Sequence, residues 1–514
     1  MHQTAKSTAP IAVTDLGTVR GASTAQPGVT VFRGIPYAAS TAGENRWRPP
    51  QPATPWSGVR DAVRFGPICP QNAGPGTLPM SEDCLAVNVW TAGVDDERRP
   101  VLVWIYGGRF ISGHGSDPTF DGAALASTGV VVVTLNYRSG VFGFLATGEL
   151  LEESIAGGGA AAGTVGNYGL LDQIAALQWV RRNIATFGGD PGRVTVAGQS
   201  AGAACVMDLV YSPLSQDLLH GAIAESGALH PGDPSLDFVA ASYRRRDDAL
   251  SQGEEWMHKH GVNTLAELRA LPVEQLLVGN DADEPGPGGH RPPLFRPVLD
   301  EVVLRRTYDD SLAGAHHRDI PVITGGNLDE DGASPLPTTT LAQYLEHAHA
   351  VYGEMGQEFL SLFPAQSDEE ARTRWNESAR AHSRSSTYLW AEAWSRAGGT
   401  APRTYYWTHA PAGHDAGTRG AFHGSEIYYV FNSLAANPER PWTHNDRTIA
   451  GVVSSYVSNF LKTGDPNGGH LPVWRRFDGE PLTMELGDAF SPRAVASATE
   501  LDFFRRFFAA RPKR

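Results

Sequence analysis

The sequence has 514 residues, of which 41% are hydrophobic, and a formal net charge of −14 at pH 7. A chain of this length and composition can bury a large core, which excludes a disordered protein. Its acidic balance repels nucleic acids and anionic membranes, so we expect neither as a partner. The chain has no apolar run near the roughly 20 residues that span a bilayer.

The N-terminus and the cysteines bear on the compartment. Residues 1–6 lack the apolar segment of a signal peptide, so we expect a cytoplasmic protein, or a secreted one whose leader has been removed. Cys69 and Cys84 bracket a loop rich in Pro and Gly and could close it as a disulfide, which persists mainly in oxidising compartments. Free thiols in a cytoplasmic enzyme are the alternative. We expect Cys205 to be a buried apolar side chain, and the spacing of the three cysteines matches no zinc site.

The first half of the chain alternates strand and helix patterns. Apolar runs at 100–106 and 129–137 suit strands buried on both faces, with a loop and a short helix at 123–128 between them. A helix with an apolar stripe follows at about 170–187, and then a strand at 193–197. This order predicts an α/β fold with a large, mostly parallel central sheet and helices on both of its faces.

The second half has a different pattern. Charged helices begin near residue 234, and we interpret the charge run within 243–260 as a solvated surface face. Strand patterns return at 295–298, 320–324 and 403–407, with a helical block at 339–397 between the last two. We therefore predict a single domain over 1–514, with helical insertions at about 234–294 and 335–400 that form a cap over a substrate pocket.

The segment Gly198-Gln199-Ser200-Ala201-Gly202 is the strongest functional motif. It follows the strand pattern at 193–197 and opens a helix-compatible run at 203–209. In that context G-x-S-x-G predicts a nucleophile elbow, a sharp turn that exposes the serine Oγ above the sheet. A chance match is the alternative in a chain with 57 glycines, but the flanking patterns argue against it.

A serine nucleophile needs a base within hydrogen-bond reach and an acid that orients the base. In α/β-hydrolases the acid follows the serine in the chain, and the histidine follows the acid. His423 is a candidate base because a glycine-flanked histidine after a strand and loop can turn its ring toward a pocket. Asp329, Glu330 and Asp331 follow the strand pattern at 321–324, where such sheets place functional residues. The residues alone leave the choice among these three carboxylates open.

Further segments, spread over nearly the whole length, carry a family pattern. They are Phe32-Arg33-Gly34-Ile35-Pro36-Tyr37-Ala38, Ser81-Glu82-Asp83-Cys84-Leu85-Ala86-Val87-Asn88-Val89-Trp90, Asn136-Tyr137-Arg138, Asn167-Tyr168-Gly169-Leu170-Leu171-Asp172-Gln173, Phe187-Gly188-Gly189-Asp190-Pro191 and Thr463-Gly464-Asp465-Pro466-Asn467. With these segments the chain resembles the type-B carboxylesterase family, which includes cholinesterases and bacterial nitrobenzyl esterases. The resemblance implies an α/β-hydrolase fold. It also implies a serine hydrolase that cleaves carboxylic esters through an acyl-enzyme intermediate, with no metal and no organic cofactor.

The resemblance also implies which residues are the acid and the base. The family's acid is the Glu of N-x-D-E-G and its base is the His of H-G-x-E, which fall on Glu330 and His423. Asp331 stands between Glu330 and Gly332, where the family usually has Glu and Gly in succession, so Asp329 and Asp331 remain alternatives. Arg46 and Glu82 match a structural salt bridge of the family.

An oxyanion hole requires backbone N–H groups where negative charge develops. One donor is Ala201, the residue after the nucleophile. By resemblance, the other donors are Gly108 and Arg109, in the glycine loop after the strand pattern at 101–106. The family usually has Gly or Ala where this chain has Arg109. The arginine side chain either folds away to solvent or contacts substrate, and the sequence leaves both open.

Other departures from the family pattern bear on the substrate. Gln199 stands where the family commonly has Glu, and residues 70–83 contain no Trp, the residue with which cholinesterases hold choline. We therefore do not expect cholinesterase specificity. A set of aromatic residues could line an acyl pocket, although packing in the core is the other interpretation: Tyr388, Trp390, Trp394, Tyr405, Tyr406 and Trp407.

Other functions remain open at this point. An amidase or a thioesterase shares the triad chemistry, since a fold alone does not set the substrate. A non-catalytic, cholinesterase-like binding protein is a second class, which the presence of Ser200, Glu330 and His423 together argues against. The expected partner is a small ester, and the expected assembly is a monomer or a homodimer.

Overall fold

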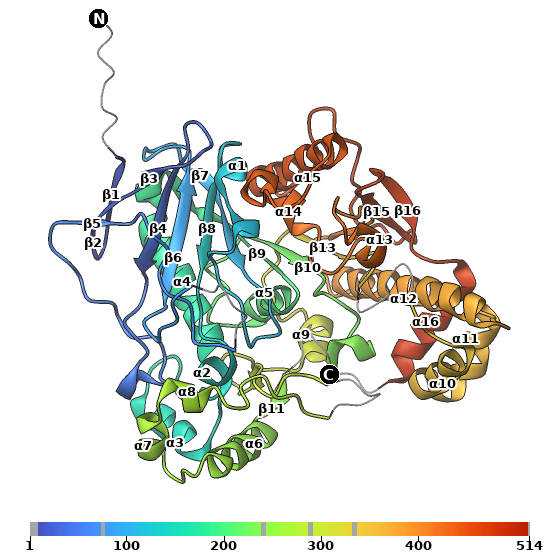
Figure 1. Ribbon diagram of the computed structural model, residues 1–514, viewed down its shortest axis with the longest axis horizontal. Helices are drawn as coiled ribbons and strands as arrows, with labels where there is room; N and C mark the ends of the chain where they lie inside the picture. The colour runs from blue at the N-terminus through green and yellow to red at the C-terminus, as the bar shows by residue number, and fades with distance from the viewer. Residues whose placement is uncertain (1–8, 73–77, 238–242, 286–290, 331–336, 512–514) are drawn as a thin grey trace, which may run out of the picture.

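The computed structural model describes residues 9–72, 78–237, 243–285, 291–330 and 337–511. Its centre is an eleven-stranded sheet with the strand order β16-β15-β14-β13-β10-β9-β7-β8-β6-β4-β3 (Figure 1). The bounds of these strands are β3 (Ala22–Ser23), β4 (Thr30–Pro36), β6 (Ala86–Thr91), β7 (Arg99–Ile105), β8 (Val131–Leu135), β9 (Gly189–Gln199), β10 (Gly221–Glu225), β13 (Val322–Asn327), β14 (Arg403–Trp407), β15 (Leu482–Leu486) and β16 (Ser491–Ala494). Smaller sheets join β1 (Ile11–Thr14), β2 (Gly17–Arg20) and β5 (Val59–Asp61), and β11 (Arg244–Arg245) and β12 (Val298–Leu299).

The strands from β15 to β8 in this order are parallel to their neighbours, and antiparallel pairs flank them on both sides. Every residue of β7 and β8 is buried, as the continuous apolar runs predict for strands covered on both faces. The predicted α/β fold with a mostly parallel sheet is therefore confirmed.

Helices pack against the strands of the sheet (Figure 1). Helices α4 and α5 pack against β9, α15 packs against β7 and β9, and α12 packs against β13 and β14. No helix in the described parts of the chain is long and apolar enough to cross a membrane. The helix bounds are α1 (Ala123–Ala126), α2 (Gly140–Phe144), α3 (Gly148–Gly157), α4 (Tyr168–Asn183), α5 (Ala201–Tyr211), α6 (Arg246–Lys259), α7 (Leu265–Ala270), α8 (Val273–Leu276), α9 (Tyr308–Ala313), α10 (Leu341–Tyr352), α11 (Gly356–Leu362), α12 (Asp368–Arg396), α13 (Ala416–Arg419), α14 (Ile427–Val430), α15 (His444–Thr463) and α16 (Ala498–Ala510).

The two predicted insertions are helical. Helices α6 to α8 occupy the first, at the lower left of Figure 1, and α10 to α12 occupy the second, at its right. The second insertion packs with the C-terminal helix α16 around an aromatic core separate from the main one: Tyr344, Tyr352, Phe359, Phe363, Phe503, Phe504, Phe507 and Phe508. The assignment of one domain with a cap stays a prediction.

The cysteines and one salt bridge test smaller expectations. Cys69 and Cys84 are buried free thiols that hydrogen-bond each other, and this bond together with burial holds the pKa of the Cys84 thiol well above its ordinary value. A disulfide between them stays a prediction. Cys205 is fully buried, as expected. Arg46 and Glu82 form the expected salt bridge, with 2.6 Å between Nη2 and Oε2 and both side chains buried.

Candidate active site

Loops that follow five neighbouring parallel strands carry the candidate residues. In sheet order, Gly108 and Arg109 follow β7, Ser200 follows β9, Ser226 follows β10, Glu330 follows β13 and His423 lies after β14. Because these strands are parallel, their carboxyl ends meet at one edge of the sheet, where α/β folds place their functional groups. The sheet therefore gathers residues that are up to 315 positions apart in the chain (423 − 108).

Ser200 lies on a strained turn between β9 and α5. Its backbone has φ 61° and ψ −128°, a region that non-glycine residues rarely adopt, and its N–H donates to the Glu225 carbonyl at 2.9 Å. A Cβ added to Gly198 or Gly202 would lie 2.6 or 2.2 Å from the Ile105 carbonyl oxygen of β7. Only glycine allows β7 to approach this closely, which explains both glycines of the motif.

Glu330 and His423, the expected acid and base, hydrogen-bond each other. His423 Nδ1 hydrogen-bonds Glu330 Oε2, and the same carboxylate accepts hydrogen bonds from Ser226 Oγ at 2.5 Å and from the Asn327 N–H at 2.8 Å. Burial opposes the charge of Glu330, but His423 and these hydrogen bonds outweigh it and hold the pKa of the carboxyl below its ordinary value. Glu330 is therefore an ionised partner that fixes the ring of His423.

The second ring nitrogen of His423 faces the elbow. His423 Nε2 lies 3.1 Å from Gln199 Nε2, so the amide N–H donates to this nitrogen when the ring proton is on Nδ1, toward Glu330. That tautomer leaves a lone pair on Nε2, as a general base requires. Among the described residues no hydrogen bond joins Ser200 Oγ to the ring, and the contact with the elbow is made by Gln199, the residue before the serine.

Asp329 has a different place from Glu330. Its carboxylate accepts hydrogen bonds from Arg380 Nη2 at 2.6 Å and from the Ala421 N–H at 2.8 Å. Its own N–H donates to the Ala421 carbonyl at 3.1 Å. Asp329 thus joins the loop of the acid to the loop of His423 without contacting the ring. Asp331, the other alternative, lies outside the described residues.

The loop after β7 packs directly against the elbow. A Cβ added to Gly107 would lie 2.5 Å from the Gln199 carbonyl oxygen and 3.1 Å from Ser200 Cβ. The next residues, Gly108 and Arg109, have φ of 119° and 57°. Ala201 is the first residue of α5, and the first N–H groups of a helix have no partner within it. The expected oxyanion donors therefore belong to two backbone segments that flank Ser200.

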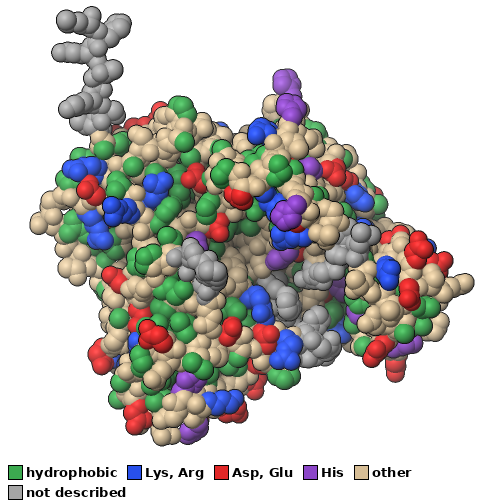
Figure 2. All heavy atoms as spheres, viewed as in Figure 1, with side chains coloured by type: hydrophobic (Ala, Val, Ile, Leu, Met, Phe, Trp, Pro, Cys, Tyr) green, Lys and Arg blue, Asp and Glu red, His purple; other side chains and the backbone are tan. Residues whose placement is uncertain are grey.

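The side chain of Arg109 is bound by another loop of the protein. Its Nη2 lies 2.5 Å from Asp283 Oδ1 and donates to the Arg291 carbonyl at 3.1 Å, and a third of the side chain is exposed. The guanidinium therefore does not point freely into solvent, which was one of the two outcomes left open by the sequence, and its contact with substrate stays a prediction. Figure 2 shows a hollow near the middle of one face, with Lys, Arg and His side chains near its edges.

The six aromatic residues between Tyr388 and Trp407 that the sequence offers as an acyl pocket are packed in the core. All six are buried, including Trp390, Trp394 and Trp407 at 0% exposure. Tyr405 and Trp407 line an internal cavity together with Glu225 and Glu426.

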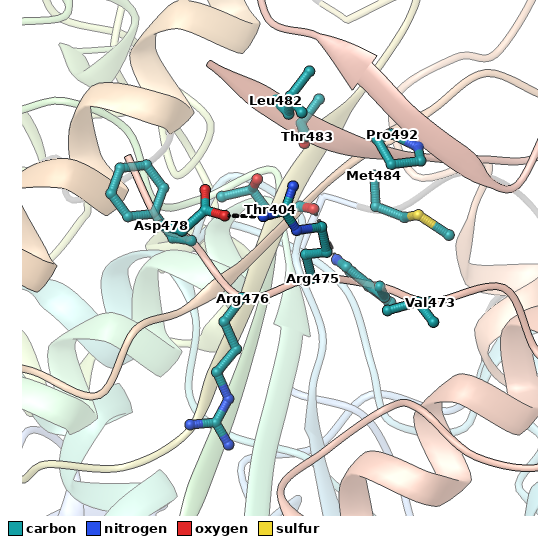
Figure 3. A pocket seen from close by; sticks show the side chains of 11 residues that line it. Thr404, Val473, Arg475, Arg476, Asp478, Leu482, Thr483, Met484 and Pro492 are labelled. Atoms are coloured by element: carbon teal, nitrogen blue, oxygen red, sulfur yellow. Dashed lines mark hydrogen bonds and ion pairs between the residues drawn. The ribbon is translucent and has the colours of Figure 1, made fainter. Parts of the chain in front are cut away.

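A surface pocket lies between the start of β14 and β15 and contains the Arg475–Asp478 ion pair (Figure 3). Its Thr404 lies near the amino end of β14, so this pocket is separate from the edge that carries His423.

Three contacting residues at this edge are not singled out by the sequence. Ser226 follows β10 directly, so the rule that strand ends carry functional groups is the signal that points to it. Asn327 is the last residue of β13 and lies in the same segment as the acid. Asp283 lies in a loop without a recognisable motif, and no sequence signal indicates its contact with Arg109.

Comparisons with known proteins agree with this geometry. The model of the carboxylesterase family matches residues 8–503. A fumonisin B1 esterase of Sphingopyxis macrogoltabida is 36% identical over 89% of this chain and 83% of its own, and a para-nitrobenzyl esterase of Bacillus subtilis is 32% identical over 89% and 90%. Among solved structures, a carboxylesterase of Geobacillus stearothermophilus superposes with a TM-score of 0.76 at 31% identity, covering 96% of this chain and 99% of its own. A structure of a PNB esterase has a TM-score of 0.78 at 30% identity, covering 97% and 100%.

Proposed function

The chain belongs to the carboxylesterase family and is a carboxylic-ester hydrolase, and we propose that Ser200 is its nucleophile, His423 its general base and Glu330 its acid. The observation that carries this assignment is the hydrogen bond between Glu330 and His423 Nδ1, beside a serine on a strained elbow. It supports the tautomer in which His423 Nε2 faces the elbow and is ready to accept a proton.

In the first half of the reaction, Ser200 Oγ attacks the ester carbonyl as His423 Nε2 takes its proton. For this step Nε2 exchanges the Gln199 amide for the serine hydroxyl, a small change because the two residues are adjacent. Glu330 stabilises the imidazolium that forms. The imidazolium then gives its proton to the leaving alcohol, and an acyl-enzyme remains on Ser200.

The tetrahedral intermediate places negative charge on the former carbonyl oxygen. The N–H groups of Gly108, Arg109 and Ala201 are the proposed donors to it, and loss of one such donor costs about 10²–10³-fold in kcat. Ala201 adds the positive end of the α5 dipole. In the second half of the reaction, His423 activates a water that attacks the acyl-enzyme, and the carboxylic acid product is released from Ser200.

The surroundings of Ser200 bear on the substrate class. Gln199 supplies an amide rather than a carboxylate next to the nucleophile, so the site offers no negative charge there to attract a cationic alcohol group. With a net charge of −14, the chain as a whole does not favour anionic polymers. We therefore expect small carboxylic esters, without a cationic alcohol, as substrates.

The decisive test is Ser200→Ala together with chemical labelling. Hydrolysis of a nitrophenyl ester should fall by on the order of 10³-fold or more, while circular dichroism and the melting temperature stay those of a folded protein. Treatment with an organophosphonate followed by peptide mass spectrometry should place one adduct on Ser200 in the wild type. Ser226→Ala is the matched control, and it should keep the adduct on Ser200. An adduct on any other serine contradicts the assignment.

A further inference from the structure

Two successive residues have a backbone conformation that is unfavourable for them in the oxyanion loop, the segment after β7 that contains Gly108 and Arg109. Arg109 has φ 57°, and the next residue, Phe110, has φ 64°, so two successive side-chain-bearing residues are in the left-handed region. For such residues that region is unfavourable, and it persists only where surrounding contacts impose it. The contacts that impose it here are therefore part of what shapes the oxyanion hole.

On one side, the loop is fixed by the neighbouring backbone. The Phe110 carbonyl accepts the Gly140 N–H at 2.6 Å, and the buried Phe110 ring packs edge-on against Phe144 with 5.8 Å between centroids. The next N–H, of Val141, donates to the Asn280 side chain at 2.7 Å. The segment that begins at Asn280 therefore lies against the same neighbourhood as the oxyanion loop.

On the other side, the Arg109 side chain joins the loop to that segment. Its guanidinium binds Asp283 Oδ1 at 2.5 Å, and three quarters of the Asp283 side chain is buried. The Arg291 carbonyl accepts a second hydrogen bond from the same Nη2. Charged hydrogen bonds of this kind are short and directional, so the pair fixes the position of the guanidinium relative to the segment.

The acceptor Asp283 is itself held on an ordered ladder. It pairs with Pro293 as an antiparallel bridge, the Leu294 N–H donates to Ala282 at 2.8 Å, and the Glu284 N–H donates to Pro292 at 3.0 Å. The side chain of Glu284 then binds Arg296 in an ion pair. Asp283 is therefore fixed in place and can restrain the Arg109 side chain.

We propose that Asp283 is a positioning residue of the oxyanion hole, which acts through the Arg109 side chain to hold the Gly108 and Arg109 N–H groups toward the reacting oxygen. This inference rests on the proposed function of Ser200. It predicts an effect on transition-state stabilisation, because the donors matter most when charge develops on that oxygen. The Asp283 carboxylate also lies 3.9 Å from Arg291 Nε, so it faces two guanidinium groups.

The main test is Asp283→Asn, which keeps the shape of the side chain and removes its charge. On a neutral nitrophenyl ester we expect kcat to fall about tenfold, less than the loss of a whole donor, with KM changed less than about twofold. Binding of a trifluoromethyl ketone, whose hydrated or serine-bound form resembles the tetrahedral intermediate, should weaken by a similar factor. Asp281→Asn is the matched control, since Asp281 lies on the same loop and accepts a hydrogen bond from Asn72.

A double-variant cycle separates action through Arg109 from any other effect. Arg109→Gly removes the guanidinium and gives position 109 a residue that adopts positive φ at little cost. In that background Asp283→Asn should change kcat by less than about twofold, because the proposed route is gone. Asp283→Glu should recover most of the activity that Asp283→Asn loses. A full tenfold loss in the Arg109→Gly background overturns the proposal.

Three further results would overturn the proposal. An unchanged kcat in Asp283→Asn overturns the proposal, and so does an equal loss in Asp281→Asn. A loss confined to esters that carry a carboxylate also overturns it and makes the pair a charge filter. Stoichiometric labelling of Ser200 by an organophosphonate should persist in Asp283→Asn. If the wild type itself is not labelled on Ser200, it is the proposed function that fails, independently of these results.

Discussion

The two halves of the site are held in place by different kinds of contact. The acid–base half, around Glu330 and His423, uses several side-chain hydrogen bonds between neighbouring loops. The Glu330 and Asp329 side chains are 13% and 2% exposed, and the His423 ring is 37% exposed. The oxyanion half combines backbone contacts on one side of its loop with an ion pair on the other, Arg109 with Asp283, whose side chains are 34% and 24% exposed. The first half is thus anchored in the sheet, while the second is adjusted from a surface loop.

This difference has an energetic consequence. Buried polar contacts are costly to break, since a partner left behind remains away from water. Partly exposed ion pairs contribute less, because water replaces either partner and salt screens them. We therefore expect substitutions in the acid–base half to cost more activity and more stability than substitutions in the oxyanion half.

The largest effect is expected for Glu330→Gln. The amide keeps the shape of the side chain but cannot stabilise the imidazolium, and neutralising the acid of a triad has cost about 10⁴-fold in kcat in a serine protease. We expect a loss of 10³-fold or more on a neutral ester. Asp331→Asn is the matched neutralisation next to it. If Asp331→Asn is the more damaging of the two, the neighbouring aspartate has the role of the acid.

The same variant has a distinct dependence of stability on pH. The pKa of Glu330 is lowered in the folded protein, so its charge stabilises the fold above the unfolded-state value of about 4.3, and this contribution is lost as the pH falls through the lower folded value. The difference in unfolding free energy between wild type and Glu330→Gln should therefore shrink below about pH 4. Urea unfolding at pH 7 and near pH 3 measures it, and a gap that widens in acid contradicts the lowered pKa.

A smaller effect is expected for Asp329→Asn. This change breaks the ion pair with Arg380 and weakens the hydrogen bond to the Ala421 N–H, so the loop of His423 loses part of its support. We expect kcat to fall about tenfold and the unfolding free energy to fall by roughly 1–3 kcal/mol. Arg380→Gln in the same background should add little. A loss as large as that of Glu330→Gln would mean that the two carboxylates have exchanged roles.

The sequence predicts the acid–base half of the site better than the contacts of the oxyanion half. Ser200 is predictable because the glycines and the strand-to-helix context at 198–202 are local, and the close approach of β7 explains them. His423 has a local signal only in its flanking glycines. The choice of Glu330 over its neighbours depends on family resemblance, and the structure supports it against Asp329 alone, whose carboxylate binds Arg380 and the Ala421 N–H.

Contacts between distant segments that no family motif marks lay beyond prediction. Arg109 and Asp283 are 174 residues apart, and nothing in the loop around Asp283 encodes a partner. The aromatic core that joins α10, α11 and α12 to α16 is of the same kind, because each helix shows only its own apolar face. Local patterns specify strands, turns and caps, whereas pairings across the fold arise from packing that a single sequence does not display.

The smallest expected effect is that of ionic strength on kcat, which should differ between the two halves of the site. Raising the ionic strength from about 0.05 M to about 0.5 M shortens the Debye length from roughly 14 to 4 Å. Screening weakens the Arg109–Asp283 pair, which joins two charged groups, more than the hydrogen bond of Glu330 to the neutral form of the His423 ring. We expect kcat on a neutral ester to fall by no more than about twofold in the wild type and to stay constant in Asp283→Asn, which has no ion pair to screen. A neutral ester keeps long-range attraction of substrate out of the measurement, and sodium chloride and potassium chloride should act alike if screening is the cause. An equal salt effect in Asp283→Asn would show that the sensitivity lies elsewhere, and it would remove the contrast between an oxyanion half that depends on an ion pair and an acid–base half that does not.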